Sequence, residues 1–224
     1  MISPYFWVKL ACPTIKYNQR PDLNNIAFFD FDGTITSTDS YTPFIFQTIP
    51  ASRMKKGKFL LAPYILGYRL KLIRGTVLRS KIFKLGFAGL DVNELQQKGL
   101  SFSQSYLPQI IRPQALKRIQ WHLAQGDRVV VVSASMDVYL KPWCAQYGLD
   151  LLCSEVDAID GKITGIYKNG DCSREVKKQR ILDNYDLSLY AAIYAYGDTI
   201  EDHEMLSLAT HAFYRWQPVH PNSL

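Results

Sequence analysis

The chain has 224 residues, of which 47% are apolar and 21% charged, and its net charge is +6. This length and composition exclude disorder as an overall description and allow one sizeable hydrophobic core, alone or with a smaller appended unit. Four cysteines occur without a CxxC pair and four histidines without ligand spacing. These patterns exclude a disulfide scaffold and a zinc module, and they favour a reducing, cytoplasmic location.

The first residues of the chain are apolar and resemble a secretory signal peptide. However, they lack a basic region at their start, and Lys9 interrupts the apolar run. We therefore interpret residues 1–25 as an N-terminal extension of the folded body. A transmembrane helix is not expected, because the longest apolar stretch, residues 59–68, is far shorter than the roughly 18 to 20 residues that a membrane span needs.

Three apolar segments predict buried strands that end in polar residues. They are residues 26–32, 127–135 and 191–199. The second contains four consecutive valines, whose β-branched side chains favour a strand over a helix. Weaker strand patterns occupy residues 149–156 and 210–216. Strands of this form predict a parallel sheet.

Helical patterns alternate with these strands from residue 113 onward. They cover residues 113–125, 138–147, 174–185 and 201–209. Asp160 and Gly161 lie between two short segments and predict a hairpin. The alternation predicts an α/β fold with a doubly wound, parallel, Rossmann-like sheet.

Residues 41–111 do not follow this alternation. About 70 residues separate the first two core strands, although a crossover needs only about a dozen. Their pattern is helical over residues 59–73, 76–88 and 91–107. We therefore predict a helical cap domain at 41–111, inserted into a core domain that is formed by residues 26–40 and 112–224.

The predicted cap carries most of the positive charge. Residues 37–127 contain 14 basic and 4 acidic residues. Between Arg53 and Lys84 there are ten basic residues and no acid, interleaved with Phe, Leu, Ile and Tyr. Such a run is often only a solvated face, but the complete absence of acids favours contact with an anionic partner.

Reactive side chains end each of the three strong strands. They are Asp30 and Asp32, Ser133, and Asp198 with Asp202. In open parallel sheets, ligands bind at the carboxyl ends of the strands. Two carboxylates at positions i and i+2 share a side of an extended chain, roughly 7 Å apart, and can bind one cation while taking separate roles. Taken alone, the first pair also fits a glycosyltransferase metal site or a turn cap.

Four motifs together resemble the haloacid dehalogenase (HAD) superfamily of phosphotransferases. They are DFDGT at 30–34, Ser133 after the valines, a lysine after residue 170, and GDTIED at 197–202, in the family's order and spacing. The position of the cap and the sequence VSASMDVYLKPWCAQYGLD further resemble the phosphoserine-phosphatase-like subfamily IB. Some members of that subfamily are phosphatidylglycerophosphatases.

The resemblance implies a role for each motif. Asp30 would attack phosphorus and form an aspartyl-phosphate, and Asp32 would protonate the leaving group and then activate water. The implied cofactor is Mg²⁺, whose oxygen ligands would come from four residues: Asp30, Asp32 through its main-chain carbonyl, Asp198, and Asp202 at or near the same shell. The phosphoryl group would be bound by residues of three motifs: Gly33, Ser133, Ala134 and Lys177.

The choice of lysine rests on spacing, because the family motif resembles C-x-G-x-x-K. This chain has Cys172 at the first position, Arg174 in place of the glycine, and Lys177 followed by Lys178. Spacing favours Lys177, since adjacent residues of a helix point about 100° apart and only one can enter the site.

In the turn after the paired carboxylates, Gly33 permits a sharp bend and Thr34 is expected to cap it.

These expectations lead to a Mg²⁺-dependent phosphatase that acts on a phosphomonoester substrate. The basic, apolar segment favours a phospholipid headgroup such as phosphatidylglycerophosphate, with the enzyme in peripheral contact with an anionic membrane at its cytoplasmic face. The alternatives are a phosphatase of a small soluble metabolite such as phosphoserine, and a non-catalytic membrane- or nucleic-acid-binding protein with a basic cap. Nucleic acid is the less favoured partner, because the catalytic motifs are intact. A phosphomutase would share these motifs.

Overall fold

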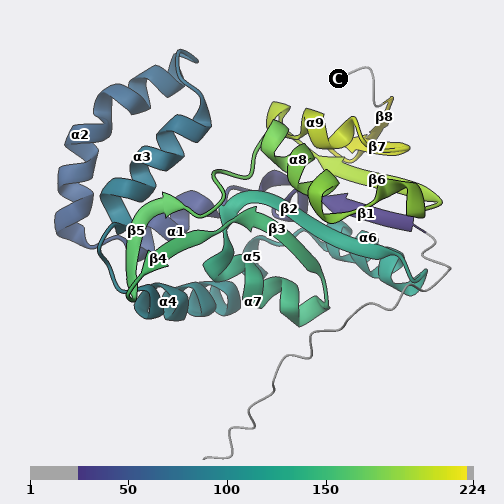
Figure 1. Cartoon of the computed structure of the whole chain (residues 1–224), viewed down its shortest axis with the longest axis horizontal. Helices are drawn as coiled ribbons and strands as arrows, with labels where there is room; N and C mark the ends of the chain where they lie inside the picture. Colours follow the sequence, from purple (N-terminus) through teal and green to yellow (C-terminus); the bar gives the residue numbers. More distant parts are fainter. Residues whose placement is uncertain (1–24, 221–224) are drawn as a thin grey trace, which may run out of the picture.

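The computed structural model describes residues 25–220. The predicted N-terminal extension, except for Asn25, lies outside these described residues. A six-stranded sheet forms the centre of the molecule, in the order β3-β2-β1-β6-β7-β8 (Figure 1). All neighbours are parallel except β7 and β8. The strands are β1 (Asn25–Phe29), β2 (Arg128–Met136), β3 (Asp150–Ser154), β6 (Ala192–Gly197), β7 (His211–Tyr214) and β8 (Gln217–Val219).

Alternate side chains of the central strands fill two separate cores. In β1, Ala27 and Phe29 face one core, while Ile26 and Phe28 face the other. The valines of β2 alternate in the same way, and all four are buried. A strand covered on both faces has no polar side, which is why these segments appear in the sequence as continuous apolar runs.

Helices cover both faces of this sheet, as the predicted α/β class requires. The first core includes Ile119 of α6 (Pro113–Ala124) and Trp143 of α7 (Asp137–Tyr147). The second core includes Ile181 of α8 (Glu175–Asn184) and Met205 of α9 (His203–Leu206). The predicted fold class is therefore confirmed.

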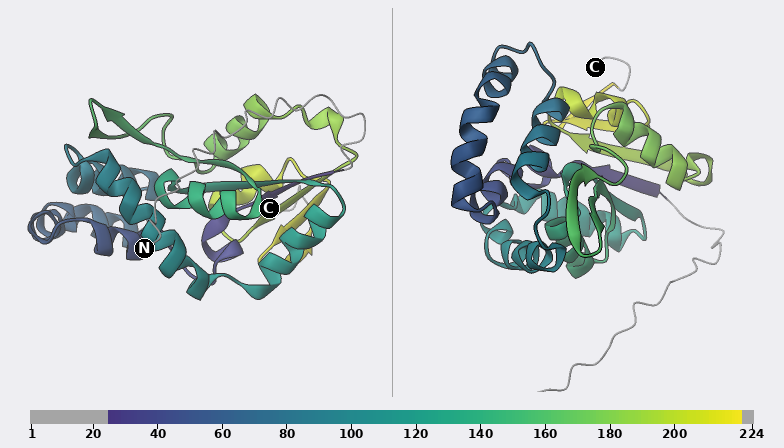
Figure 2. Two further views of the ribbon diagram at one scale, coloured as in Figure 1. Left: turned by 90° about the horizontal axis from the view of Figure 1, so that it is seen from below. Right: turned by 60° about the vertical axis from the view of Figure 1, so that its left-hand side comes forward.

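The inserted region between β1 and α6 is helical, and its helices begin and end at other residues than the sequence patterns indicate. It contains α1 (Tyr41–Thr48), α2 (Ala51–Arg69), α3 (Gly75–Phe87), α4 (Val92–Ser105) and α5 (Leu107–Ile110). Helix α2 begins eight residues earlier than the apolar pattern indicates, because its first turns carry lysines that face solvent. Helices α2 and α3 pack together beside the sheet, whereas α4 packs against α7 (Figures 1 and 2).

A hairpin of β4 (Val156–Ile159) and β5 (Lys162–Tyr167) packs against α3. Its two-residue turn is formed by Asp160 and Gly161, both with positive φ, as expected for a tight hairpin turn.

The predicted helix at 201–209 is shorter in the structure. It consists of one 3-10 turn (Ile200–Asp202) and the single-turn helix α9. The Thr199 hydroxyl and the Asp202 carboxylate cap the first turn.

Within residues 25–220, no helix is long and apolar enough to cross a membrane.

Candidate active site

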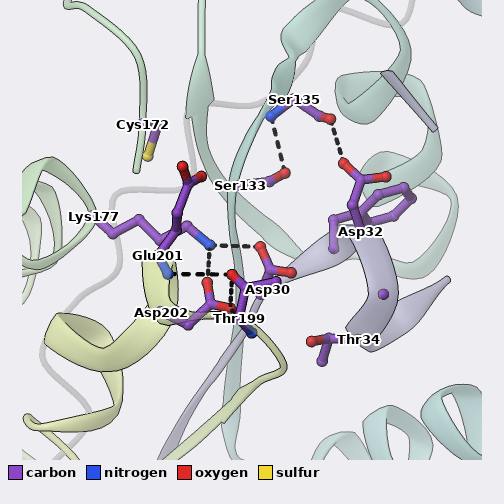
Figure 3. Close-up of polar contacts among 12 residues, drawn as sticks. Asp30, Asp32, Thr34, Ser133, Ser135, Cys172, Lys177, Thr199, Glu201 and Asp202 are labelled. Atoms are coloured by element: carbon purple, nitrogen blue, oxygen red, sulfur yellow. Dashed lines mark hydrogen bonds and ion pairs between the residues drawn. The ribbon is translucent and has the colours of Figure 1, made fainter. Parts of the chain in front are cut away.

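The carboxyl ends of β1, β2 and β6 lie next to one another and bring the predicted residues together (Figure 3). Asp30 follows β1, Ser133 lies near the end of β2, and Asp198 follows β6. Lys177 reaches the same place from α8, on the second face of the sheet. The site is thus assembled from four segments that are far apart in the sequence.

Lys177 joins two of the carboxylates. Its Nζ atom donates to Asp30 Oδ1 at 2.5 Å and to Asp202 Oδ1 at 2.6 Å, and the lysine is only 1% exposed. Burial would lower the pKa of Lys177, but attraction to Asp202 and Asp30 outweighs it and raises the pKa above its ordinary value. Burial also raises the pKa of Asp30, helped by repulsion from Asp202 and opposed by Lys177. The site therefore contains a lysine that stays charged at neutral pH beside the carboxylate of Asp30. Lys178 is less buried than Lys177 and does not make these contacts.

Both carboxylate oxygens of Asp202 accept hydrogen bonds. Oδ1 accepts from Lys177, while Oδ2 accepts from the main-chain N–H of Asp198 at 3.1 Å and from the N–H and hydroxyl of Thr199 at 3.0 Å. Although burial would raise the pKa of Asp202, Lys177 and these backbone groups hold it below the usual value. Asp202 consequently orients the loop after β6 and the lysine.

Asp32 has a different environment from Asp30. Its carboxylate accepts from Ser135 Oγ at 2.5 Å and from the Ser40 N–H at 2.7 Å. Burial, followed by repulsion from Asp39, raises the pKa of Asp32 to about 6, despite the opposing hydrogen bonds from Ser135 and Ser40. A carboxyl group with this pKa exchanges protons near neutral pH, as a general acid and base requires.

Gly33 allows Asp198 to approach the turn after β1. Its φ is +85°, and a Cβ atom at this position would lie 2.3 Å from Asp198 Oδ2. Thr34 does not cap the turn as expected: its hydroxyl donates to Asp198 Oδ1 at 3.1 Å. The hydroxyl of Thr36 instead accepts from the Gly33 N–H at 3.1 Å. The cap lies two residues further on because the bend directs Thr34 toward β6.

Asp30, Asp198 and Asp202 each place a carboxylate oxygen within 4.8 Å of the others. Such a set of hard oxygen donors fits a divalent cation such as Mg²⁺. Among the described residues, the carboxylate of Asp198 accepts one hydrogen bond, from the Thr34 hydroxyl, and it forms no ion pair. Burial and then the charge of Asp202 raise the pKa of Asp198, and a cation at this position would relieve that repulsion.

Ser133 and Ala134 border the same cavity as these carboxylates. Ser133 is 1% exposed, and its Oγ accepts from the Ser135 N–H at 3.1 Å. Cys172 lies nearby but is buried, and burial raises the pKa of its thiol to about 11, so it remains a neutral packed thiol at physiological pH.

The cavity has a volume of about 1460 Å³ and extends from the carboxylates to the inserted helices. Its wall contains nine lysines and arginines and six acidic residues, so it favours an anionic occupant. Toward α2 and α3 the wall becomes apolar, with Met54, Leu61, Ile65, Ile82 and Leu85.

Two sets of contacts at this site were not anticipated from the sequence. Ser40 and Ser135 hold Asp32, and Arg79 of α3 pairs with Asp171 at 2.6 Å and Glu201 at 3.0 Å. Arg79 thereby connects the inserted helices to the core. No local spacing predicts these pairs, because their partners are 8 to 122 residues apart.

Comparisons with known proteins agree with this fold. Residues 27–207 match the haloacid dehalogenase-like hydrolase family. Protein CicA of Caulobacter vibrioides is 31% identical over 195 residues, covering 84% of each chain. Histidinol-phosphatase of Neisseria meningitidis is 25% identical over 202 residues, covering 84% of this chain and 88% of its own.

Two solved structures have the same fold. A Bordetella pertussis protein of unknown function superposes with a TM-score of 0.73 at 22% identity, covering 86% of this chain and 90% of its own. A phospho-aspartyl intermediate analogue of phosphoserine phosphatase has a TM-score of 0.56 at 16% identity, covering 86% and 87%.

The family match and a phosphatase among the relatives show that this chain is a hydrolase. This chain belongs to the haloacid dehalogenase-like hydrolase family. The family predicted from the four motifs is therefore confirmed.

Proposed function

We propose that this enzyme is a Mg²⁺-dependent phosphomonoesterase that works through an aspartyl-phosphate intermediate. Its proposed substrate is a phosphate monoester on a phospholipid headgroup, such as that of phosphatidylglycerophosphate. The observation that carries this proposal is the shared cavity, which joins Asp30, Asp32 and Lys177 to a wall that is cationic and then apolar.

In the proposed reaction, a carboxylate oxygen of Asp30 attacks phosphorus while Asp32 donates its proton to the leaving oxygen. Asp32 then takes a proton from the water that hydrolyses the aspartyl-phosphate. Its pKa of about 6 suits both proton transfers. Ser133, Lys177 and the main chain at Gly33 and Ala134 bind the non-bridging oxygens and stabilise the charge of the transition state.

The donor set at the strand ends fits Mg²⁺. Asp30, Asp198 and the main-chain carbonyl of Asp32 would bind it directly, and Asp202 would support the same site. When bound, Mg²⁺ would neutralise the phosphoryl charge and lower the repulsion that the nucleophile meets.

The surface of α2 and of the segment that follows it supports a membrane-bound substrate. Phe59 is 83% exposed and Leu72 is 76% exposed, close in sequence to Lys55, Lys56 and Lys71. Each basic residue near an anionic surface contributes about 1 kcal/mol, and exposed apolar groups insert at the interface. This pattern supports peripheral contact with an anionic membrane at its cytoplasmic face.

A soluble substrate is the second candidate, because one relative is a histidinol-phosphatase. A phosphatase of a small metabolite would use the same carboxylates without the apolar wall. The third interpretation, a non-catalytic binding protein, is disfavoured by the intact site and the family membership.

A single assay distinguishes these candidates. The purified enzyme is given phosphatidylglycerophosphate in anionic liposomes, phosphoserine and histidinol phosphate, each with Mg²⁺ and with a chelator. We expect phosphate release that requires Mg²⁺ and is fastest with the lipid. Faster hydrolysis of a soluble ester would contradict the lipid substrate, and no release from any ester would contradict the phosphatase itself.

A further inference from the structure

Arg174 has a backbone conformation that residues with a side chain rarely adopt. Its φ is +52° and its ψ is −130°, which is a region accessible mainly to glycine. The conformation is held by the Arg174 N–H, which donates to the Glu201 carbonyl at 3.0 Å. A strained residue persists where its side chain contributes something that glycine cannot, so the side chain of Arg174 requires an explanation.

The side chain of Arg174 is incompletely satisfied by the protein. Its Nε atom is buried and has no hydrogen-bond partner among residues 25–220, and the guanidinium makes no ion pair with a carboxylate in this part of the chain. A buried N–H group without a partner is unfavourable. The two terminal nitrogens of the guanidinium are not enclosed in this way and make no hydrogen bond within residues 25–220, so they remain available to an acceptor on a ligand in the cavity that Arg174 borders.

Other arginines that border the cavity differ from Arg174. Arg79 is bound to Asp171 and Glu201, Arg112 donates to the carbonyls of Gly33 and Thr36, and Arg53 donates to the carbonyls of Gly86 and Ala88. Arg69 and Arg74 are exposed on the inserted helices. Arg174 differs from these arginines because it belongs to the core, is half-buried, and has an Nε atom without a hydrogen-bond partner among the described residues.

The position of Arg174 suits a group next to the phosphate that is removed. It lies three residues before Lys177, at the same end of α8, and its N–H is bonded to the residue before Asp202. In the proposed reaction, Lys177 and Ser133 already bind the phosphoryl group that is removed. We propose that Arg174 determines specificity by binding a second anionic group of the substrate, a phosphodiester or a carboxylate. The planar guanidinium matches either group with two parallel hydrogen bonds.

This inference rests on the phosphomonoesterase activity proposed above and narrows its substrate class to phosphomonoesters with a second negative charge. It does not depend on acyl chains or on a membrane. Soluble compounds therefore test it separately from the lipid proposal.

The test compares three soluble monoesters: glycerol 1-phosphate, which has no second anion; 3-phosphoglycerate, which has a carboxylate; and glycerophosphoglycerol phosphate, which has a phosphodiester. For each of the two esters that have a second anionic group, the preference is its kcat/KM divided by the kcat/KM of glycerol 1-phosphate. We expect wild type to prefer one of the two, and the choice identifies the second group. The variant Arg174→Gln should reduce that preference roughly 10- to 100-fold.

Two further variants complete the experiment. Lys178→Gln removes a charge from the same helix outside the cavity wall, and it should keep the wild-type preference within about twofold. Arg174→Gly relieves the backbone strain, so it should lose the preference and melt at a higher temperature than Arg174→Gln. The inference would be overturned if wild type hydrolyses all three esters with equal kcat/KM, or if Arg174→Gln and Arg174→Gly keep the wild-type preference. Failure of wild type on all three esters would instead reject the phosphomonoesterase.

Discussion

The carboxylate site and the α2–α3 pair differ in how their charges are satisfied. In the site, Asp30, Asp32, Asp198 and Asp202 each have a partner within 3.1 Å. By contrast, α2, α3 and the segment that joins them carry ten basic residues between Arg53 and Lys84, of which just one, Arg79, pairs with a carboxylate of the described chain. A satisfied cluster holds reacting groups in one geometry, whereas unpaired cations remain available to a ligand. The difference supports the proposed separation between catalysis at the carboxylates and contact with an anionic membrane at α2 and α3.

The largest expected effects come from replacing the proposed nucleophile and the proposed acid and base of the carboxylate site. Asp30→Asn should abolish turnover, because an amide is a poor nucleophile and removes a charge from the proposed metal site. Asp32→Asn should slow hydrolysis of the covalent intermediate by roughly 10²- to 10⁴-fold, since only proton transfer is lost. Steady-state and pre-steady-state phosphate release measure both. Near-normal turnover by Asp30→Asn would show that another group attacks phosphorus.

The next effect separates the two adjacent lysines. Lys177→Ala should lower kcat/KM by roughly 100-fold or more, because a buried, charge-assisted hydrogen bond to the phosphoryl group is lost. Lys178→Ala is the matched control and should change kcat/KM by less than about threefold, as expected for a more exposed charge. Equal losses in the two variants, or a larger loss in Lys178→Ala, would show that Lys177 is not the lysine that contacts the phosphate.

Gly33→Ala tests whether the close approach of Asp198 matters. An added Cβ would lie 2.3 Å from the Asp198 carboxylate, at a backbone φ of +85°. We expect the displacement of this proposed ligand to weaken activation by Mg²⁺ by roughly 10- to 100-fold. Titration of activity with Mg²⁺ measures the change, and thermal unfolding shows how much of it is due to lost stability. An unchanged Mg²⁺ titration in a folded variant argues against Asp198 as a ligand.

The unpaired cations are tested by their salt-sensitive binding to membranes. Lys55→Gln with Lys56→Gln should reduce sedimentation with anionic liposomes several-fold and should leave hydrolysis of a small soluble ester unaffected. Lys117→Gln with Lys168→Gln removes the same charge from exposed positions on other elements and should not affect binding. If wild type does not sediment with anionic liposomes at low salt, a soluble substrate becomes the better account.

The smallest expected effect is on the pH dependence of stability, through a histidine in the core beneath the site. His122 is buried between Asp127, at 2.7 Å, and the hydroxyl of Tyr196, at 3.0 Å. Burial lowers the pKa of His122, although the hydrogen bond to Asp127 opposes the shift. The folded state therefore binds fewer protons than the unfolded state, so stability should be complete above about pH 6.5 and decline below it. Thermal melts from pH 8 to 5 should show a smaller decline for His122→Gln than for wild type. An equal decline would assign the pH dependence to other groups.

The sequence predicts the strands and their reactive ends because each depends on a short local pattern. Consecutive valines in β2 and the DFDGT motif require no knowledge of distant residues. Contacts made by Ser135, Ser40 and Arg79 could not be predicted, since they join segments that approach only in the folded chain. The start of α2 was placed too late because solvent-facing lysines give its first turns no apolar period. For Arg174, the replaced glycine in the motif was a local signal, but its meaning required the backbone angles.

The central claim, that Asp30 is phosphorylated during turnover, is tested most directly by trapping the intermediate. The enzyme is mixed with Mg²⁺ and a phosphomonoester, quenched in acid and digested, and the peptides are analysed by mass spectrometry. We expect one additional phosphoryl group on the peptide containing Asp30 in wild type and none on that peptide in Asp30→Asn. Turnover without any phosphorylated peptide, or with the phosphoryl group on another residue, would contradict the mechanism.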